Sequence, residues 1–521
     1  MRRDLLVAAA SGALLSLALP PNNWWPLLFA LTPLSTLVAL APRNRRAFWL
    51  GFAFGLPFFT LYILWLPASF AQPNFFGPFF WLLFPPLVLL LSAFWGLVTL
   101  LARLLGGGGG LTLLLLPPLW ILMEWARAQG YFAFPWGTIG YGWLDSPVAQ
   151  LADTFGVWGL GLLTAGVAAL FAVPFLSLGR SGRYVSVAPG VEPPRQPGPL
   201  LRFAPPLAGL LLLVGAWAWG SQKLEWELPE PTEVAVLVQP NIDPFGRVTG
   251  PVSDFDVLSE LTAAGVDNAA GDPDLVVWPE GALIGGLEGQ AMVDEIQELA
   301  PEATFLIGAR MRDGDGRSYN SALTIAGGEV IDRYDKYYLV PFGERFPLIE
   351  TAEPLYRAVF GLFGLPVLEG TFPGESFEPL ESPEGLQGAY ICYESVFPQV
   401  QRQMVRDGAT VLLNITNDAW FARGNGARQH YEMGSMRAIE ARRYILRSGI
   451  DGITGVVDPF GRTLHEMPRG IPGFVVAQFA HLDVETPYVR YGHLLLPLLL
   501  GWVLLGWATR LLTKRQRSVA T

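Results

Sequence analysis

Long apolar stretches recur along this chain and restrict what it can fold into. A helix needs about 20 consecutive, mostly apolar residues to cross the hydrocarbon core of a bilayer. Such stretches cover residues 5–20, 24–41, 47–66, 79–102, 111–126, 155–178, 201–220 and 491–511. The first begins with basic residues as a signal peptide does, but no small-residue cleavage site follows it, so a retained helix is expected. The pattern predicts a polytopic α-helical membrane domain with eight transmembrane helices.

Charged residues divide the chain into three predicted domains. Residues 1–220 form a seven-helix transmembrane domain, 221–490 a polar domain, and 491–521 the eighth helix with a basic cytoplasmic tail. The middle domain holds 20 of the 35 Lys and Arg residues and 40 of the 45 Asp and Glu residues. A strongly acidic domain argues against nucleic acid as a partner, because nucleic-acid binding requires a basic surface.

The basic residues between the spans predict an orientation. If the N-terminus is cytoplasmic, basic clusters at 2–3, 43–46, 180–202 and 510–517 all fall on the cytoplasmic side, whereas Arg127 falls outside. This distribution follows the positive-inside rule. The 221–490 domain is therefore expected outside the cytoplasm.

The polar domain alternates strand-like and helix-like patterns. Short β-branched runs predict strands at 233–241, 274–280, 304–310, 321–327, 388–395, 410–416 and 452–459. Helical periodicity predicts helices near 254–270, 288–300 and 426–447. Such alternation is typical of a layered α/β domain, in which functional residues collect where strands end.

Three polar residues occupy positions of that kind. Glu280 closes the run LVVWPE, Lys336 follows the strand-like EVIDRYDK, and Cys392 ends another strand in AYICYES. Each also has an ordinary interpretation, since a glutamate after a strand is usually solvated and a buried cysteine is usually a small hydrophobic residue. The composition favours function, because Lys336 is the one lysine well inside the polar domain and Cys392 is the chain's single cysteine.

The chemistry of these side chains explains why they would be grouped. A thiol needs a base or a positive neighbour to become a good nucleophile. A carboxylate can take its proton, and an ammonium can stabilise the thiolate and then an oxyanion. The four histidines are scattered and none is near these motifs in sequence, so a Cys–His pair and a metal site are not expected, and no cofactor is required.

The motifs WPEGAL, YDKYYLVPFGERFP and ICYESVFP resemble the Glu, Lys and Cys motifs of the nitrilase (carbon–nitrogen hydrolase) superfamily. The resemblance is closer to its membrane-bound branch, the apolipoprotein N-acyltransferases. That family is similar in its eight spans, in the domain before the last span, and in the motifs SYNS, PFGE, CYE and NDAWF. A nitrilase-like α-β-β-α sandwich is implied.

The resemblance also implies roles for individual residues. Glu280 would be the general base, Lys336 the stabiliser of thiolate and oxyanion, and Cys392 the acylated nucleophile. Supporting or substrate-binding roles are implied for Glu344, Tyr393, Glu394 and Trp420. A tryptophan that such enzymes can carry after the first strand has no clear counterpart in QPNIDPFGRV (239–248).

The implied reaction transfers an acyl chain from a phospholipid, phosphatidylethanolamine by resemblance, through a cysteine thioester. The implied acceptor is the N-terminal amine of a diacylglyceryl-modified cysteine in apolipoproteins, the last step of lipoprotein maturation. The enzyme would act as a monomer in the bacterial inner membrane, with its catalytic domain on the periplasmic side. An apolar segment at 345–368 follows PFGE and predicts an exposed lid that contacts lipid, with an ordinary core helix as the competing interpretation.

Two other classes of function stay open on the sequence. One is a membrane-tethered amidase or nitrilase that passes its acyl group to water. The other is a lipid or lipoprotein receptor, or a transporter, whose polar domain has no activity. The spans are almost free of ionisable residues apart from Glu124, and a complete Glu-Lys-Cys set is present, so both alternatives are less favoured.

Overall fold

The computed structural model describes residues 2–70, 80–180, 199–242, 254–361, 370–422 and 424–519. The chain divides into two compact units. The first contains residues up to Arg127, Pro135–Trp226 and the C-terminal segment from Tyr491. The second contains Ala128–Phe134 and Glu227–Arg490.

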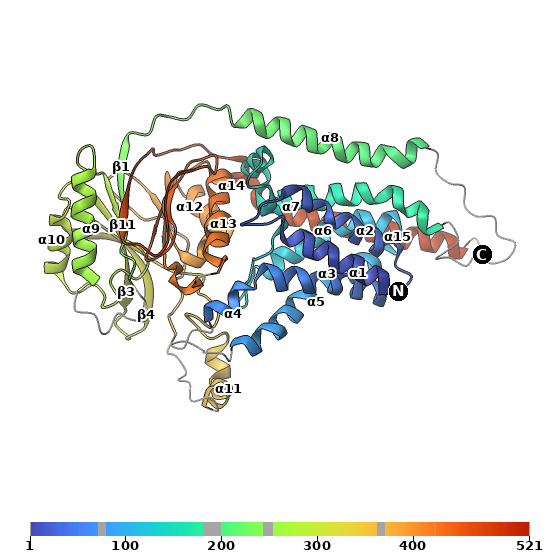
Figure 1. The fold of residues 1–521 in the computed structure, drawn as a ribbon, viewed down its shortest axis with the longest axis horizontal. Helices are drawn as coiled ribbons and strands as arrows, with labels where there is room; N and C mark the ends of the chain where they lie inside the picture. Colours follow the sequence, from blue (N-terminus) through green and yellow to red (C-terminus); the bar gives the residue numbers. More distant parts are fainter. Residues whose placement is uncertain are drawn as a thin grey trace. The chain divides into compact units, whose positions relative to one another are not determined.

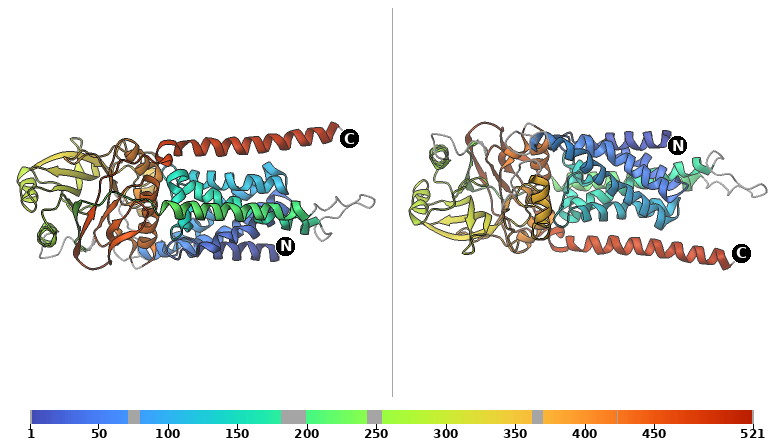
Figure 2. Two further views of the ribbon diagram at one scale, coloured as in Figure 1. Left: turned by 90° about the horizontal axis from the view of Figure 1, so that it is seen from above. Right: turned by 90° about the horizontal axis from the view of Figure 1, so that it is seen from below.

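The first unit is built of helices that run side by side (Figures 1 and 2). Its α-helices are α1 (Arg2–Ser16), α2 (Leu31–Leu40), α3 (Asn44–Tyr62), α4 (Trp65–Phe70), α5 (Phe80–Gly106), α6 (Gly110–Arg127), α7 (Ala152–Ala172), α8 (Pro199–Lys223) and α15 (Leu495–Val519). Short 3-10 helices η1 (Trp25–Ala30), η3 (Ile139–Trp143), η4 (Pro147–Leu151) and η5 (Val173–Arg180) join them, and η8 (Gly492–Leu494) leads into α15.

Five helical segments in the described part of the chain are long and apolar enough to cross a membrane: Asn44–Ser69, Trp81–Gly106, Pro147–Leu176, Arg202–Lys223 and Pro487–Thr513. They correspond to the predicted spans 47–66, 79–102, 155–178, 201–220 and 491–511, of which residue 79 lies outside the described residues. The predicted spans 5–20, 24–41 and 111–126 form the shorter helices α1, α2 with η1, and α6. A total of eight spans therefore stays a prediction.

The second unit contains two β-sheets. The first has the strand order β11-β1-β2-β3-β4-β5, and the second has the order β10-β9-β8-β7-β6. The strands are β1 (Glu233–Gln239), β2 (Leu275–Val277), β3 (Thr304–Arg312), β4 (Ser318–Ala326), β5 (Glu329–Asp335), β6 (Gln387–Ile391), β7 (Val411–Thr416), β8 (Ile445–Gly449), β9 (Thr454–Val457), β10 (Thr463–Met467) and β11 (Gly473–Phe479). Strands β1, β2 and β3 are parallel, as are β6, β7 and β8.

The two sheets pack face to face between helices, which gives four layers (Figure 1). Helices α9 (Asp254–Asn268) and α10 (Gln290–Glu298) cover the first sheet, with Leu258 and Ile296 fully buried in its core. Helices α12 (Pro398–Arg406) and α13 (Gly426–Ala441) cover the second sheet. Strands β1 and β8 meet at the sheet interface, where Ser448 Oγ donates to the carbonyl oxygen of Val238 at 2.6 Å. The predicted α-β-β-α sandwich is confirmed.

One predicted boundary is wrong. The helix expected near 426–447 ends at Ala441, because Arg442 adopts a left-handed conformation with φ of 52° and caps it. Residues Ile445–Gly449 then form β8, a buried parallel strand. Burial between neighbouring strands decides the structure here, which helical periodicity alone does not show.

Candidate active site

Glu280 follows the short buried strand β2 and is held close to β3. Gly308 on β3 makes this approach possible, because a Cβ there would lie 2.2 Å from the carbonyl oxygen of Pro279 and 2.7 Å from the Cα of Glu280. Oε1 of Glu280 accepts hydrogen bonds from Asn320 Nδ2 at 2.7 Å and from Lys336 Nζ at 3.1 Å. Its Oε2 is buried and has no hydrogen-bond partner among the described residues. That oxygen is therefore available to take a proton.

Lys336 follows β5 and is 1% exposed. Its ammonium lies 3.1 Å from Glu280 Oε1 and 2.9 Å from Glu344 Oε2. Burial alone would lower the pKa of Lys336, but the two carboxylates, Glu280 first, raise it well above its ordinary value. Lys336 is therefore a permanent positive charge between two negative ones.

Asn320 links the same two carboxylates, a role that its position in the sequence does not predict. Its Nδ2 donates to Glu280 Oε1 at 2.7 Å and to Glu344 Oε1 at 2.8 Å. The backbone N–H of Val340 fixes the other oxygen of Glu344 at 2.9 Å. Asn320 lies in β4, within the motif SYNS that had been noted only as part of the resemblance. Its neighbours come from distant segments, so sequence spacing alone could not reveal it.

Cys392 lies where β6 ends and the 3-10 helix η6 (Cys392–Val396) begins. Its φ of 50° is left-handed, which is unfavourable for a residue with a Cβ. Burial, and next the negative charge of Glu280, raises the pKa of the thiol, although Lys336 acts in the opposite direction. The cysteine therefore rests as a thiol and needs a base at the moment of attack. The strain of its left-handed backbone conformation is typical of functional sites.

Glu394 ties this turn to the loop after Lys336. Its Oε1 accepts from Tyr334 Oη at 2.7 Å and from the N–H groups of Tyr337 and Tyr338 at 2.8 and 3.1 Å. Its Oε2 accepts from the N–H of Ile391 at 2.8 Å. The side chain is fully buried, and burial raises its pKa to about 7, although the donors of Ile391, Tyr334 and Tyr337 and the charge of Lys336 lower it. Glu394 thus positions backbone on both sides of the site.

A pH dependence of stability follows from Glu394. The folded-state pKa of Glu394 is above the ordinary value of 4.5, so between pH 4.5 and about 7 the native protein holds a proton that the unfolded chain has released. The stabilisation from this group is therefore lost as pH rises from 4.5 to about 7. Glu394→Gln removes the dependence. The stability advantage of the wild type over Glu394→Gln should shrink by about 3 kcal/mol across that window and then stay constant. Thermal melting in detergent from about pH 5 to about pH 8 measures it; parallel curves would contradict it.

Tyr393 and Trp420, the other two predicted supporting residues, occupy different settings. Tyr393 is buried, and its hydroxyl donates to the carbonyl oxygen of Ala133 at 2.6 Å, a residue that belongs to the same unit. Trp420 lies on the 3-10 helix η7 (Asp418–Phe421) and is 36% exposed. The stretch 239–248, which has no clear counterpart of the tryptophan that such enzymes can carry, is described only up to residue 242.

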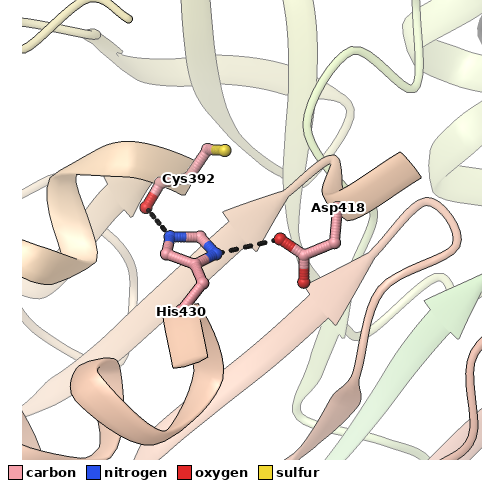
Figure 3. Close-up of side chains that lie close together, drawn as sticks. All are labelled: Cys392, Asp418 and His430. Atoms are coloured by element: carbon pink, nitrogen blue, oxygen red, sulfur yellow. Dashed lines mark hydrogen bonds and ion pairs between the residues drawn. The ribbon is translucent and has the colours of Figure 1, made fainter. Parts of the chain in front are cut away.

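Beside the backbone of Cys392 the structure places His430, a residue that is distant from the Cys392 motif in sequence (Figure 3). His430 comes from α13, far along the chain, and its Nε2 lies 2.9 Å from the carbonyl oxygen of Cys392 and 2.8 Å from Ser395 Oγ. Its Nδ1 lies 2.9 Å from Asp418 Oδ1. The sulfur points away from the imidazole, so the two residues do not form a Cys–His pair.

The Sγ of Cys392, a nitrogen of His430 and an oxygen of Asp418 lie within 4.8 Å of one another, as the ligands of a metal ion would. Other partners occupy two of the three groups. Arg447 Nη2 binds Asp418 Oδ2 at 2.7 Å and lies 3.1 Å from His430 Nδ1, and Ser395 Oγ lies 2.8 Å from His430 Nε2. Burial alone would raise the pKa of Asp418, but Arg447 and then His430 lower it. The cluster is therefore a charged hydrogen-bond network rather than a prepared cation site.

Comparison with known proteins identifies the family. Residues 11–170 match the family described as apolipoprotein N-acyltransferase N-terminal domain, and residues 236–485 match the carbon–nitrogen hydrolase family. A protein called apolipoprotein N-acyltransferase from Geobacter metallireducens is 32% identical, over 94% of this chain and 92% of its own length. The chain belongs to the apolipoprotein N-acyltransferase family.

Further relatives carry the same name. The apolipoprotein N-acyltransferase of Allorhizobium ampelinum is 32% identical over 92% of this chain and 90% of its own length. That of Pseudomonas aeruginosa is 31% identical over 96% of this chain and 95% of its own length. The resemblance inferred from the motifs is confirmed, and the carbon–nitrogen hydrolase match falls within the second unit.

Proposed function

We propose that this chain transfers an acyl chain from a phospholipid to the N-terminal amine of the diacylglyceryl-modified cysteine of apolipoproteins, through a thioester on Cys392. The observation that carries the proposal is that the charges of Glu280 and Lys336 both act on the thiol of Cys392, a buried residue with a left-handed backbone conformation. Oε2 of Glu280 has no hydrogen-bond partner among the described residues and can take the proton. The names of the relatives supply the lipoprotein acceptor. Phosphatidylethanolamine is the proposed donor, and the enzyme acts as a monomer.

In the first half-reaction the thiol hydrogen of Cys392 passes to Glu280 Oε2 as Sγ attacks the ester carbonyl carbon. The carbonyl oxygen becomes an oxyanion, which Lys336 Nζ and the N–H of Tyr393 stabilise. The carbon–oxygen bond to the glycerol then breaks. The departing oxygen takes the proton back from Glu280, so a lysophospholipid leaves and the acyl group stays on sulfur.

In the second half-reaction the acceptor amine attacks the thioester carbon. Glu280 takes a proton from the attacking nitrogen, and the same oxyanion forms again. The carbon–sulfur bond breaks, the sulfur recovers the proton, and an amide is released. The burial of Cys392 limits water at the sulfur, which protects the thioester from hydrolysis.

Exposed apolar side chains in the second unit favour a lipid substrate. Helix α11 (Ile349–Gly361) projects from the sandwich (Figure 1). Leu348, Leu355 and Val359, in and just before it, are exposed, as is Phe342 of the PFGE motif. Residues 362–368 of the predicted lid lie outside the described residues. An amphipathic helix of this kind binds an acyl chain or the bilayer surface more readily than water. We place this unit on the periplasmic side of the inner membrane.

Intact-mass measurement tests the proposal directly. Purified protein incubated with phosphatidylethanolamine should gain the mass of one acyl group, and adding a synthetic diacylglyceryl-cysteine peptide should discharge it as N-acyl product. Because the chain has one cysteine, a thioester can form only at Cys392. Absence of the adduct in active protein would exclude a thioester intermediate from the mechanism. Release of free fatty acid instead of N-acyl peptide would favour a hydrolase of the amidase class.

Glu280→Gln tests the base. The amide keeps the shape of the side chain but cannot accept the thiol proton, so the rate of thioester formation should fall by about 10² to 10⁴-fold. Glu288 is an exposed glutamate on the following loop, so Glu288→Gln is the matched control and should leave the rate unchanged. Single-turnover mass spectrometry follows both variants. Equal rates for Glu280→Gln and wild type would exclude Glu280 as base.

A further inference from the structure

The carbonyl oxygen of Cys392 has a side-chain partner that the reaction above does not use. His430 Nε2 lies 2.9 Å from that oxygen. A carbonyl oxygen only accepts hydrogen bonds, so we assign the hydrogen of this contact to Nε2. Ser395 Oγ, 2.8 Å from the same nitrogen, is compatible with this assignment because a hydroxyl oxygen also accepts.

This hydrogen bond bears on the next residue, because the carbonyl of Cys392 and the N–H of Tyr393 belong to one peptide unit. In a trans peptide the two groups lie in one plane and point in opposite directions. Figure 3 shows the carbonyl of Cys392 directed at His430 and the sulfur on the other side. Fixing the carbonyl therefore aims the N–H of Tyr393 toward the side of the sulfur, where the oxyanion forms.

The hydrogen bond also changes the donor strength of that N–H. A peptide whose carbonyl accepts a hydrogen bond is polarised, and its N–H becomes a better donor. The effect is larger in a buried site, and His430 is fully buried. The left-handed conformation of Cys392 adds a reason for such an anchor, since it is unfavourable unless neighbouring contacts fix it.

His430 is itself rigidly held. Asp418 Oδ1 lies 2.9 Å from its Nδ1, and Asp418 Oδ2 accepts from Arg447 Nη2 at 2.7 Å. All three side chains are at most 3% exposed. Thr416 Oγ1 also donates to Asp418 Oδ1, at 3.0 Å. A buried and fully engaged network of this kind fixes the imidazole in one orientation.

We propose that His430 is a positioning residue for the oxyanion site: its Nε2–H holds the Cys392 carbonyl and thereby aims and polarises the N–H of Tyr393. Asp418 and Arg447 hold the imidazole for this task. The inference rests on the proposed acylation of Cys392.

Two substitutions of His430 separate this role from general support of the fold. In His430→Gln the side-chain nitrogen can occupy the position of Nε2 and still donate to the Cys392 carbonyl, but the Nδ1 contact with Asp418 is lost. In His430→Asn the nitrogen can occupy the position of Nδ1 and keep Asp418, but the carbonyl loses its donor. Each variant loses one of the two contacts, so they are matched.

The primary readout is the infrared carbonyl band of the acyl-enzyme, formed with phosphatidylethanolamine carrying ¹³C at the ester carbonyl. An effective oxyanion site lowers this frequency below that of a free thioester. We expect the lowered band in wild type and His430→Gln, and a shift toward the free thioester in His430→Asn. The kcat of His430→Asn should fall by about 100-fold, the order of a lost oxyanion donor, with KM little changed, while His430→Gln retains most of the wild-type rate.

The possible failures are distinguishable. No thioester band in wild type would overturn the proposed function itself. Two results would overturn only the role of His430. In one, the wild type shows the lowered band and His430→Asn shows it at the same frequency; in the other, both variants shift equally toward the free thioester. If His430→Asn does not fold, His430→Gln decides alone: the proposal requires it to show the wild-type band, and a free-thioester band overturns it.

Discussion

Cys392→Ala is expected to abolish acyl transfer while leaving the protein folded. The substitution removes the sulfur that carries the acyl group, and removal of a nucleophile from a comparable covalent enzyme costs about 10⁶-fold in kcat. Cys392→Ser should be similarly inactive, because a hydroxyl is harder to deprotonate than a thiol in a buried site that already disfavours the anion. Transfer of a labelled acyl chain to a diacylglyceryl-cysteine peptide measures the loss.

A third substitution at the same position tests whether activity is lost because the nucleophile is absent or because the protein is misfolded. Cys392 has a φ of 50°, which glycine adopts without strain. Cys392→Gly should therefore melt at a higher temperature than Cys392→Ala and be equally inactive. An inactive variant that is more stable than the alanine variant cannot owe its inactivity to misfolding. Full activity in any of the three would exclude Cys392 as nucleophile.

The membrane helices and the sandwich could be predicted from the sequence because each has a local signal. Apolar length marks α3, α5, α7, α8 and α15, and β-branched runs mark most of the central strands. Strands β10 and β11 were missed. Four of the five side chains of β10 are exposed, and β11 pairs with the distant β1, so little in their own sequence separates them from loops.

The residues of the candidate site also divide into those that have a local signal in the sequence and those that do not. Glu280, Lys336 and Cys392 stand out because each ends a strand and two of the three belong to rare residue types in this chain. Asn320 and His430 carry no such local signal. Asn320 matters because it reaches Glu280 and Glu344 together, and His430 because α13 brings it to the backbone of Cys392. Such roles exist only once distant segments meet, so they emerge from the structure.

Lys336→Arg is expected to remove activity although it preserves the charge. The ammonium is 1% exposed and lies within about 3 Å of both Glu280 and Glu344. A planar guanidinium is larger and cannot replace a compact ammonium in this space, and overpacking of this kind typically costs about 1–3 kcal/mol. It would also displace the oxyanion donor, with an expected loss of about 10² to 10³-fold in kcat. Arg333→Lys, at a partly exposed ion pair with Asp335 on β5, is the control and should retain activity.

Charge balance distinguishes the catalytic role of Lys336 from its structural role. Lys336→Met leaves Glu280 and Glu344 facing each other without a cation, and breaking a buried ion pair from one side costs about 3–5 kcal/mol. Adding Glu344→Gln removes one of the two negative charges, so the double variant should melt at a higher temperature than Lys336→Met alone. It should nevertheless stay inactive, because no cation faces the oxyanion. Recovery of transfer together with stability would mean that Lys336 serves only to neutralise the carboxylates, and the acyl-transfer mechanism would then need a different oxyanion donor.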